Sequence, residues 1–257
     1  MTKSLTLSLL SLAMVASTLL ACDTLRAARG CGFVPLDSSV VAPVRPSSAA
    51  PIGADERERR AREIMAARFG LPIESAVVHE QMTQAYGNGI TAYVFKLYGP
   101  DGRYLGPILV DASCAPLSEA GLDLARTIAD VRERGKVDAQ LSDAVARALP
   151  TSDVPVTFQL VAPAWDGPPT PWPLDLPSNA WNTFVEQHAD VFYRPLVLPF
   201  VEHLRLIGAG DINPNLAPGA YVKDAWVFAR VPSDQVCAVA RRSDVLRAAY
   251  SPPVSLN

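Results

Sequence analysis

The stretch Val154-Pro155-Val156-Thr157-Phe158-Gln159-Leu160-Val161 decides the fold of the C-terminal half of this chain. Apolar and polar side chains alternate along it, so that Val156, Phe158 and Leu160 share one side of the backbone. A period of two predicts a strand with one buried face. Pro155 lies near the start of the stretch, where a strand tolerates a residue that has no N–H.

Helical and extended patterns alternate after this strand. We expect a helical stretch at 179–207, room for a strand at 210–216, a strand region at 220–231, a short helix at 232–241 and a last strand at 245–250. Pro195 and Pro199 should each break or kink the long helix, which gives two helices or one bent pair. The order strand, helix, strand, strand, helix, strand predicts a ferredoxin-like, split βαβ module.

The expected core of this module follows the inward period of each element. It comprises Phe158, Leu160, Leu204, Val227, Val239 and Val245. A helix just before the first strand should add the face Val137, Leu141, Val145 and Leu149 and end at Pro150.

A smaller α+β pattern precedes this module. A helix should begin near Ala54 and end at Gly70, because glycine favours a helix C-terminus and Pro72 prevents its continuation. Ile90 to Tyr98 and Tyr104 to Val110 are rich in β-branched and aromatic residues and predict a hairpin. A further helix should begin at Ser118-Glu119 and run to about Arg134.

The first residues of the chain read as an export signal. Lys3 precedes an apolar stretch, which Leu19-Leu20-Ala21-Cys22 closes. This ending resembles the bacterial lipobox, in which the cysteine is acylated and becomes the new N-terminus. The resemblance implies lipid attachment at Cys22 and a place in the bacterial cell envelope, periplasmic or surface-facing. A membrane-spanning anchor and ordinary cleavage after Ala21 are the two alternatives.

We therefore expect four parts. They are a signal peptide at 1–21, a Pro/Ser/Ala-rich tether at 22–53, a helix-plus-hairpin module at 54–134 and the ferredoxin-like module at 135–257. The tether holds Pro35, Pro43, Pro46 and Pro51 and should be extended and poorly packed.

Composition agrees with an exported globular protein. The chain has 257 residues, 49% of them hydrophobic, and a formal net charge of −3, so no basic face for nucleic acid is expected. With Cys22 acylated, an odd number of cysteines remains: Cys31, Cys114 and Cys237. At most one internal disulfide can form, and the sequence does not name the pair. The alternative is that Cys114 and Cys237 are small buried residues, and we favour it.

Two segments resemble the prodomains of bacterial subtilisin-like proteases. Gly135-Lys136-Val137-Asp138 through Leu160 is similar to their opening, and Ala225 through Val245 to their closing half. The segment from Arg57 to Pro116 is similar to a small module that precedes some such prodomains. In this family the open sheet face docks on the protease and the C-terminal tail lies in its cleft. The resemblance implies that this tail is Pro253, Val254, Ser255, Leu256 and Asn257.

The sequence presents no motif for catalysis. It lacks a His-Glu-x-x-His pair, a Gly-x-Ser-x-Gly elbow, a phosphate-binding loop and a Cys-x-x-Cys pair. We expect a non-enzyme without cofactor or metal. Trp165 and Trp172 predict either an aromatic ligand surface or a loop pinned to the core by its tryptophans.

Three functions remain open. The first is a membrane-tethered module that docks or inhibits a subtilisin-like protease. The second is a structural or interaction lipoprotein that has no protease partner, because a fold does not fix a function. The third, an enzyme of an unrecognised class, has the least support.

Overall fold

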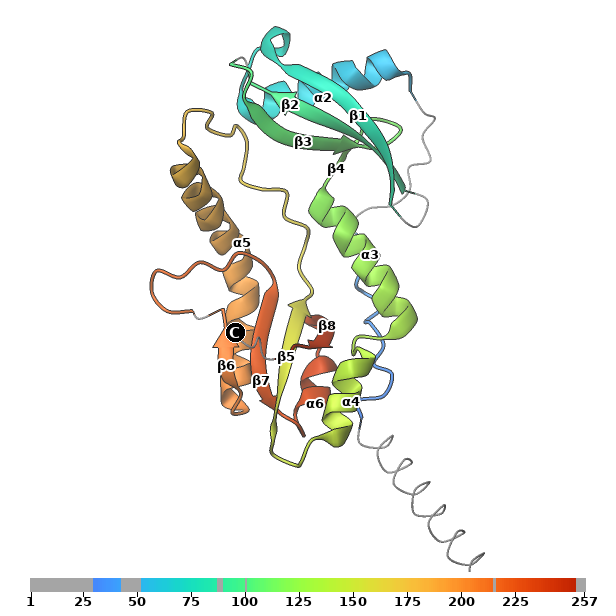
Figure 1. Cartoon of the computed structure of the whole chain (residues 1–257), viewed down its shortest axis with the longest axis vertical. Helices are drawn as coiled ribbons and strands as arrows, with labels where there is room; N and C mark the ends of the chain where they lie inside the picture. The colour runs from blue at the N-terminus through green and yellow to red at the C-terminus, as the bar shows by residue number, and fades with distance from the viewer. Residues whose placement is uncertain (1–29, 43–51, 87–89, 100, 215, 253–257) are drawn as a thin grey trace, which may run out of the picture.

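The computed structural model describes residues 30–42, 52–86, 90–99, 101–214 and 216–252 (Figure 1). Helices and antiparallel sheets make up an α+β protein, as the sequence predicts. The N-terminal module contains α2 (Ala54–Phe69), η1 (Ile73–Ser75), β1 (Val77–Tyr86), β2 (Ile90–Tyr98), β3 (Tyr104–Val110), β4 (Pro116–Leu117) and α3 (Glu119–Arg134). The C-terminal module contains α4 (Ala139–Arg147), β5 (Asp153–Leu160), α5 (Ser178–Leu206), β6 (Gly210–Asn213), β7 (Trp226–Pro232), α6 (Val236–Ala240) and β8 (Val245–Tyr250).

Local signals define the N-terminal module. Its strands are ordered β1-β2-β3-β4, and α2 packs Met65 and Phe69 against them. Gly70 ends α2 in the left-handed conformation, with φ of 64° and its N–H bonded to the Ala66 carbonyl. Ser118 caps α3 by accepting a hydrogen bond from the Gly121 N–H at 2.8 Å. The hairpin and both helices are confirmed.

The C-terminal module is built around β5. Its sheet has the order β6-β7-β5-β8, and every neighbouring pair is antiparallel. The alternation along β5 is confirmed, with Val154, Val156, Phe158 and Leu160 buried against α5 and α6. All six predicted core residues are at most 2% exposed. The elements follow one another in the order strand, helix, strand, strand, helix, strand.

The expectation of two separate helices is wrong, because α5 is one helix that runs through Pro195 and Pro199. Each proline removes one backbone N–H and frees the carbonyl four residues earlier. Both prolines are exposed, and so is Val191, whose carbonyl precedes Pro195 by one turn, so water can satisfy the freed groups. The opposite side of the same segment is packed. Its Val197, Phe200, Val201 and Leu204 are fully buried, and this burial holds the helix together.

Two other boundaries differ from expectation. Leu149 is not a core residue: α4 ends at Arg147 and Leu149 is 75% exposed. Pro150 disfavours the helical conformation for the residue before it. Leu149 therefore lies outside α4 and does not share the buried face of that helix. The predicted strand region at 220–231 narrows to β7, because residues 220–223 are hydrogen-bonded to side chains of α5. The Val222 N–H donates to Asp190 Oδ1 at 2.6 Å.

The tether expectation is wrong for residues 30–42. Cys31, Val34 and Val40 are buried, the first two in the core of the C-terminal module. The Val34 carbonyl accepts from the Lys136 N–H at 2.8 Å, and Arg132 donates to the Val40 carbonyl at 2.7 Å. Residues 43–51 lie outside the described residues. Small apolar side chains and a cysteine bind this segment to the module, although it has no regular period.

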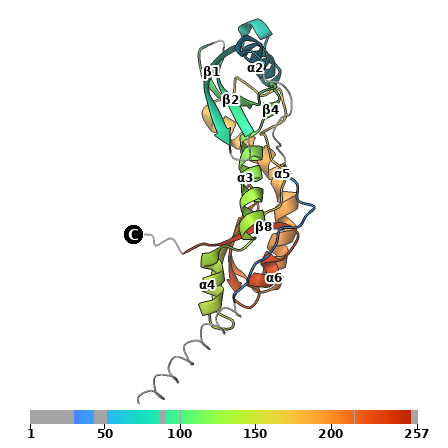
Figure 2. The ribbon, with the colours of Figure 1, turned by 90° about the vertical axis from the view of Figure 1, so that its right-hand side faces the viewer.

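The two modules lie one above the other along the long axis, with α3 running between them (Figures 1 and 2). Their sheets have separate cores. Contacts nevertheless cross the expected boundary at 134/135. Trp172 and Leu174, which follow β5, pack on the core of the N-terminal module, and Ile128 of α3 packs on Leu246 of β8.

Candidate functional site

One candidate surface is the face of the C-terminal sheet opposite α5 and α6. Figure 2 shows both helices on the same side of β8. The outward residues follow from the register, since directly paired residues of antiparallel strands share a face. We call this surface the outer sheet face and define it by Thr157, Gln159, Trp226, Phe228, Arg247 and Ala249.

Trp226 is the large exposed side chain of the outer sheet face. It pairs with Gln159, which in turn pairs with Arg247 across β5. Trp226 is 41% exposed, whereas Phe158 and Phe200 of the same module are fully buried. The Arg247 guanidinium forms an ion pair with Asp130 of α3 at 3.6 Å. Tryptophan and arginine are the residues most enriched where proteins bind proteins tightly.

The two tryptophans of the sequence prediction do not gather into one surface. Trp165 contacts Phe192 and Tyr193 of α5, with ring centroids 6.4 and 6.1 Å away. Trp172 lies farther along the same loop and packs edge-on against Phe69 of α2 at 5.5 Å. Both side chains are half-buried within the molecule. Their placement fits the second interpretation, a loop pinned to the cores by its tryptophans.

Trp172 has the denser set of contacts. Its backbone N–H donates to the Arg68 carbonyl at 2.7 Å, and its indole N–H donates to the Pro168 carbonyl at 2.7 Å. The Arg68 guanidinium lies 4.9 Å from the ring centroid. On its other side the ring meets Trp181 of α5 at 5.6 Å. Trp172 therefore joins α2 to α5, a role that the sequence did not indicate.

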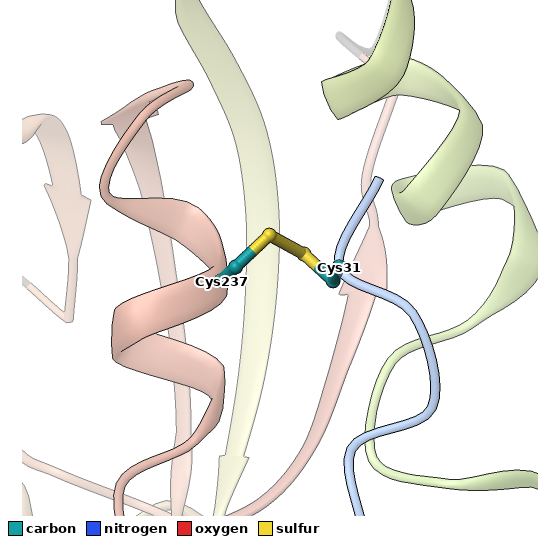
Figure 3. The surroundings of a disulfide bond; sticks show 2 residues. All are labelled: Cys31 and Cys237. Carbon is teal, nitrogen blue, oxygen red and sulfur yellow. A yellow bond between two sulfur atoms is a disulfide. The ribbon is translucent and has the colours of Figure 1, made fainter. Parts of the chain in front are cut away.

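Cysteine pairing is the clearest correction. Cys31 and Cys237 form a disulfide across 206 residues, which joins the N-terminal segment to α6 (Figure 3). The expectation that Cys237 is a plain buried residue is wrong; for Cys114, a buried free thiol, it is confirmed. Burial raises the pKa of the Cys114 thiol, which keeps it protonated and unreactive.

Asp190 and Arg194 of α5 form hydrogen bonds that hold neighbouring segments together. Asp190 accepts from Arg194 Nε at 2.9 Å and from the Val222 N–H, and these bonds tie α5 to the segment before β7. The Arg194 guanidinium holds the pKa of the Asp190 carboxyl below its usual range. His188 Nδ1 lies 2.8 Å from the Phe184 carbonyl of its own helix. Within the described ranges, no three His, Cys, Asp or Glu side chains cluster as metal ligands would.

A groove of about 660 Å³ lies between α3 and the loop that follows β5. Its walls include Leu124 and Ile128 of α3 and Val161 and Pro163 of the loop. Asp166 is the one charged side chain among its described lining residues. The groove therefore offers shape but few groups that could orient a ligand.

The other predicted site residues, Cys22 and the tail from Pro253 to Asn257, lie outside the described residues. Every helix in the described part of the chain is too short or too polar to cross a lipid bilayer. Comparison of the chain with protein-family models, curated proteins and solved structures found no match.

Proposed function

We propose that this protein is a lipid-anchored lipoprotein of the bacterial cell envelope that binds a protein partner through its outer sheet face. The observation that carries the proposal is Trp226, which is 41% exposed on the sheet face opposite α5 and α6, with Arg247 on the same face two strands away. Exposed tryptophan and arginine side chains on one surface are typical of a protein interface.

The disulfide supports the export part of the proposal. Disulfides persist in oxidising compartments such as the periplasm and are rare in the bacterial cytosol. Cys31 and Cys237 are joined in the same chain that begins with an export signal ending at Cys22. The two features are independent, since one is a local sequence pattern and the other a contact between distant residues.

The proposed partner is a subtilisin-like protease. We propose that the C-terminal module is ferredoxin-like, and its β-α-β-β-α-β order and antiparallel β6-β7-β5-β8 sheet support this class. The prodomains that the sequence resembles have this fold. In this proposal the tail from Pro253 to Asn257 enters the cleft as an added strand. Pro253 and the preceding Pro252 lack N–H donors, so weak or transient binding is expected. A structural lipoprotein without a protease partner is the second candidate.

The anchor is tested by replacing its cysteine. Cys22→Ser removes the thiol that would carry the lipid, so the protein should leave the membrane fraction or remain unprocessed. Metabolic labelling with palmitate measures the modification directly. A wild-type protein without label would overturn the lipoprotein part of the proposal.

The interface is tested with a matched pair of variants. Trp226→Ala should abolish partner capture from envelope extracts and inhibition of a panel of subtilisin-like proteases. Leu206→Ala removes a side chain that is still more exposed, at the end of α5, and should leave both unchanged. Deletion of Pro252 to Asn257 tests the tail separately. If the intact protein inhibits no protease at micromolar concentration and captures none, the structural lipoprotein becomes the better account.

A further inference from the structure

The N-terminal segment is fastened to one end of the molecule. Gly30 packs directly on α4, where a Cβ added to it would lie 2.6 Å from Ser142 Oγ. Cys31 is then bonded to α6, and Val34 is hydrogen-bonded to Lys136 just before α4. From this end the segment runs toward α3, where Val40 packs against Ile128. The chain next reaches the N-terminal module, where the Ile52 N–H donates to the Ala112 carbonyl.

The lipid site lies close to this fastening in the sequence. Only residues 23–30 separate Cys22 from Cys31. A fully extended chain spans about 3.3–3.6 Å per residue, so the segment from Cys22 to Cys31 reaches at most about 30 Å. The sequence predicts a tether of residues 22–53. Because the disulfide and the buried side chains fix the chain from Cys31 onward, only residues 23–30 link Cys22 to the folded module.

The opposite end of the molecule lies past the whole length of α3. The 16 residues of α3 span about 24 Å at 1.5 Å per residue, and the N-terminal sheet lies past its far end. Figures 1 and 2 both place α4 and α6 at one end of the long axis and α2 with β1 at the other. An anchored molecule thus has one end that the short link holds near the lipid site and one end at the far limit of the long axis.

We propose that the α4–α6 end of the protein faces the lipid bilayer and that the N-terminal sheet is held away from it. This inference rests on the proposed lipid anchor and adds its orientation. The occupant of the α4–α6 end is the membrane surface, fixed there by the shortness of residues 23–30. The outer sheet face then lies along the side of a standing molecule, and the N-terminal sheet is the part most accessible to partners from outside.

The test uses the full-length lipidated protein in vesicles whose lipid headgroups carry an acceptor dye. Donor dyes are placed at one exposed position on each end, through Gln140→Cys on α4 or Ala67→Cys on α2. Both variants carry Cys114→Ser. Because Cys22 is acylated and Cys31 is paired with Cys237, the introduced thiol is the only one open to labelling.

Energy transfer to the lipids should be strong from position 140 and lost from position 67. Equal transfer from both positions, or stronger transfer from position 67, would overturn the orientation. A second variant inserts 20 Gly and Ser residues after Ala28, which adds a flexible span of about 25 Å without touching the folded region. Transfer from position 140 should then fall toward the value at position 67, and an unchanged value would contradict the role of the short link.

Failure of the anchor is distinguishable from failure of the orientation. Mass spectrometry of the N-terminal peptide reports whether Cys22 carries lipid, and flotation with the vesicles reports binding. A protein that lacks lipid and does not float refutes the proposed function. A lipidated protein that floats and shows no difference between positions 140 and 67 refutes the orientation alone.

Discussion

Removal of the Cys31–Cys237 disulfide should lower the free energy of unfolding by several kcal/mol, on the order expected for a long closed loop. The bond closes a loop of 206 residues that contains the whole N-terminal module and most of the C-terminal one. Loop-closure entropy for that length gives about 5 kcal/mol at 25 °C. We expect a measured loss of about 3–5 kcal/mol in the free energy of unfolding, because residual structure in the unfolded chain lowers the entropy gained.

The assay is urea denaturation of the mature protein, comparing the wild type with the Cys31→Ser/Cys237→Ser double variant. The variant should unfold at lower urea, and its dependence on urea should steepen because an unlinked chain exposes more surface. Cys114→Ser is the matched control, since it removes a buried thiol and leaves the disulfide intact. A loss below about 1 kcal/mol would refute the argument that this bond holds the N-terminal segment on the module.

Three further predictions concern single side chains. Trp172→Ala should cost about 3 kcal/mol in the free energy of unfolding and, by urea denaturation, separate the unfolding of the two modules, whereas Trp172→Phe should cost less. Asp190→Asn should lower the free energy of unfolding by about 2 kcal/mol at neutral pH. Because Arg194 lowers the pKa of Asp190, the ionised carboxylate contributes its full stability above the ordinary aspartate pKa. This contribution should be lost as the pH falls through the lowered pKa of the folded state. Lys136 is buried and donates to the Arg242 carbonyl at 2.8 Å, and burial lowers its pKa. Lys136→Met should therefore be neutral or stabilising in thermal unfolding at pH 7, and this advantage over the wild type should shrink as pH rises toward the ordinary lysine value.

The sequence by itself determined the features that depend on near neighbours. The alternation around Phe158 specified a half-buried strand, and Gly70 and Ser118 specified a helix end and a helix start. Such signals arise from interactions within a few residues, namely side-chain period, capping hydrogen bonds and allowed backbone angles. The elements, their order and the core of the C-terminal module were therefore predictable.

Only the tertiary structure decided the contacts between distant residues. Nothing near Cys31 indicates that its partner is Cys237 and not Cys114, because the choice depends on which thiols the folded chain brings together. The burial of Val34, the joining of the modules by Trp172 and the unbroken helix through Pro195 have the same origin. In each case, packing against residues far along the chain outweighed the local preference, and local preference is what a sequence pattern reports.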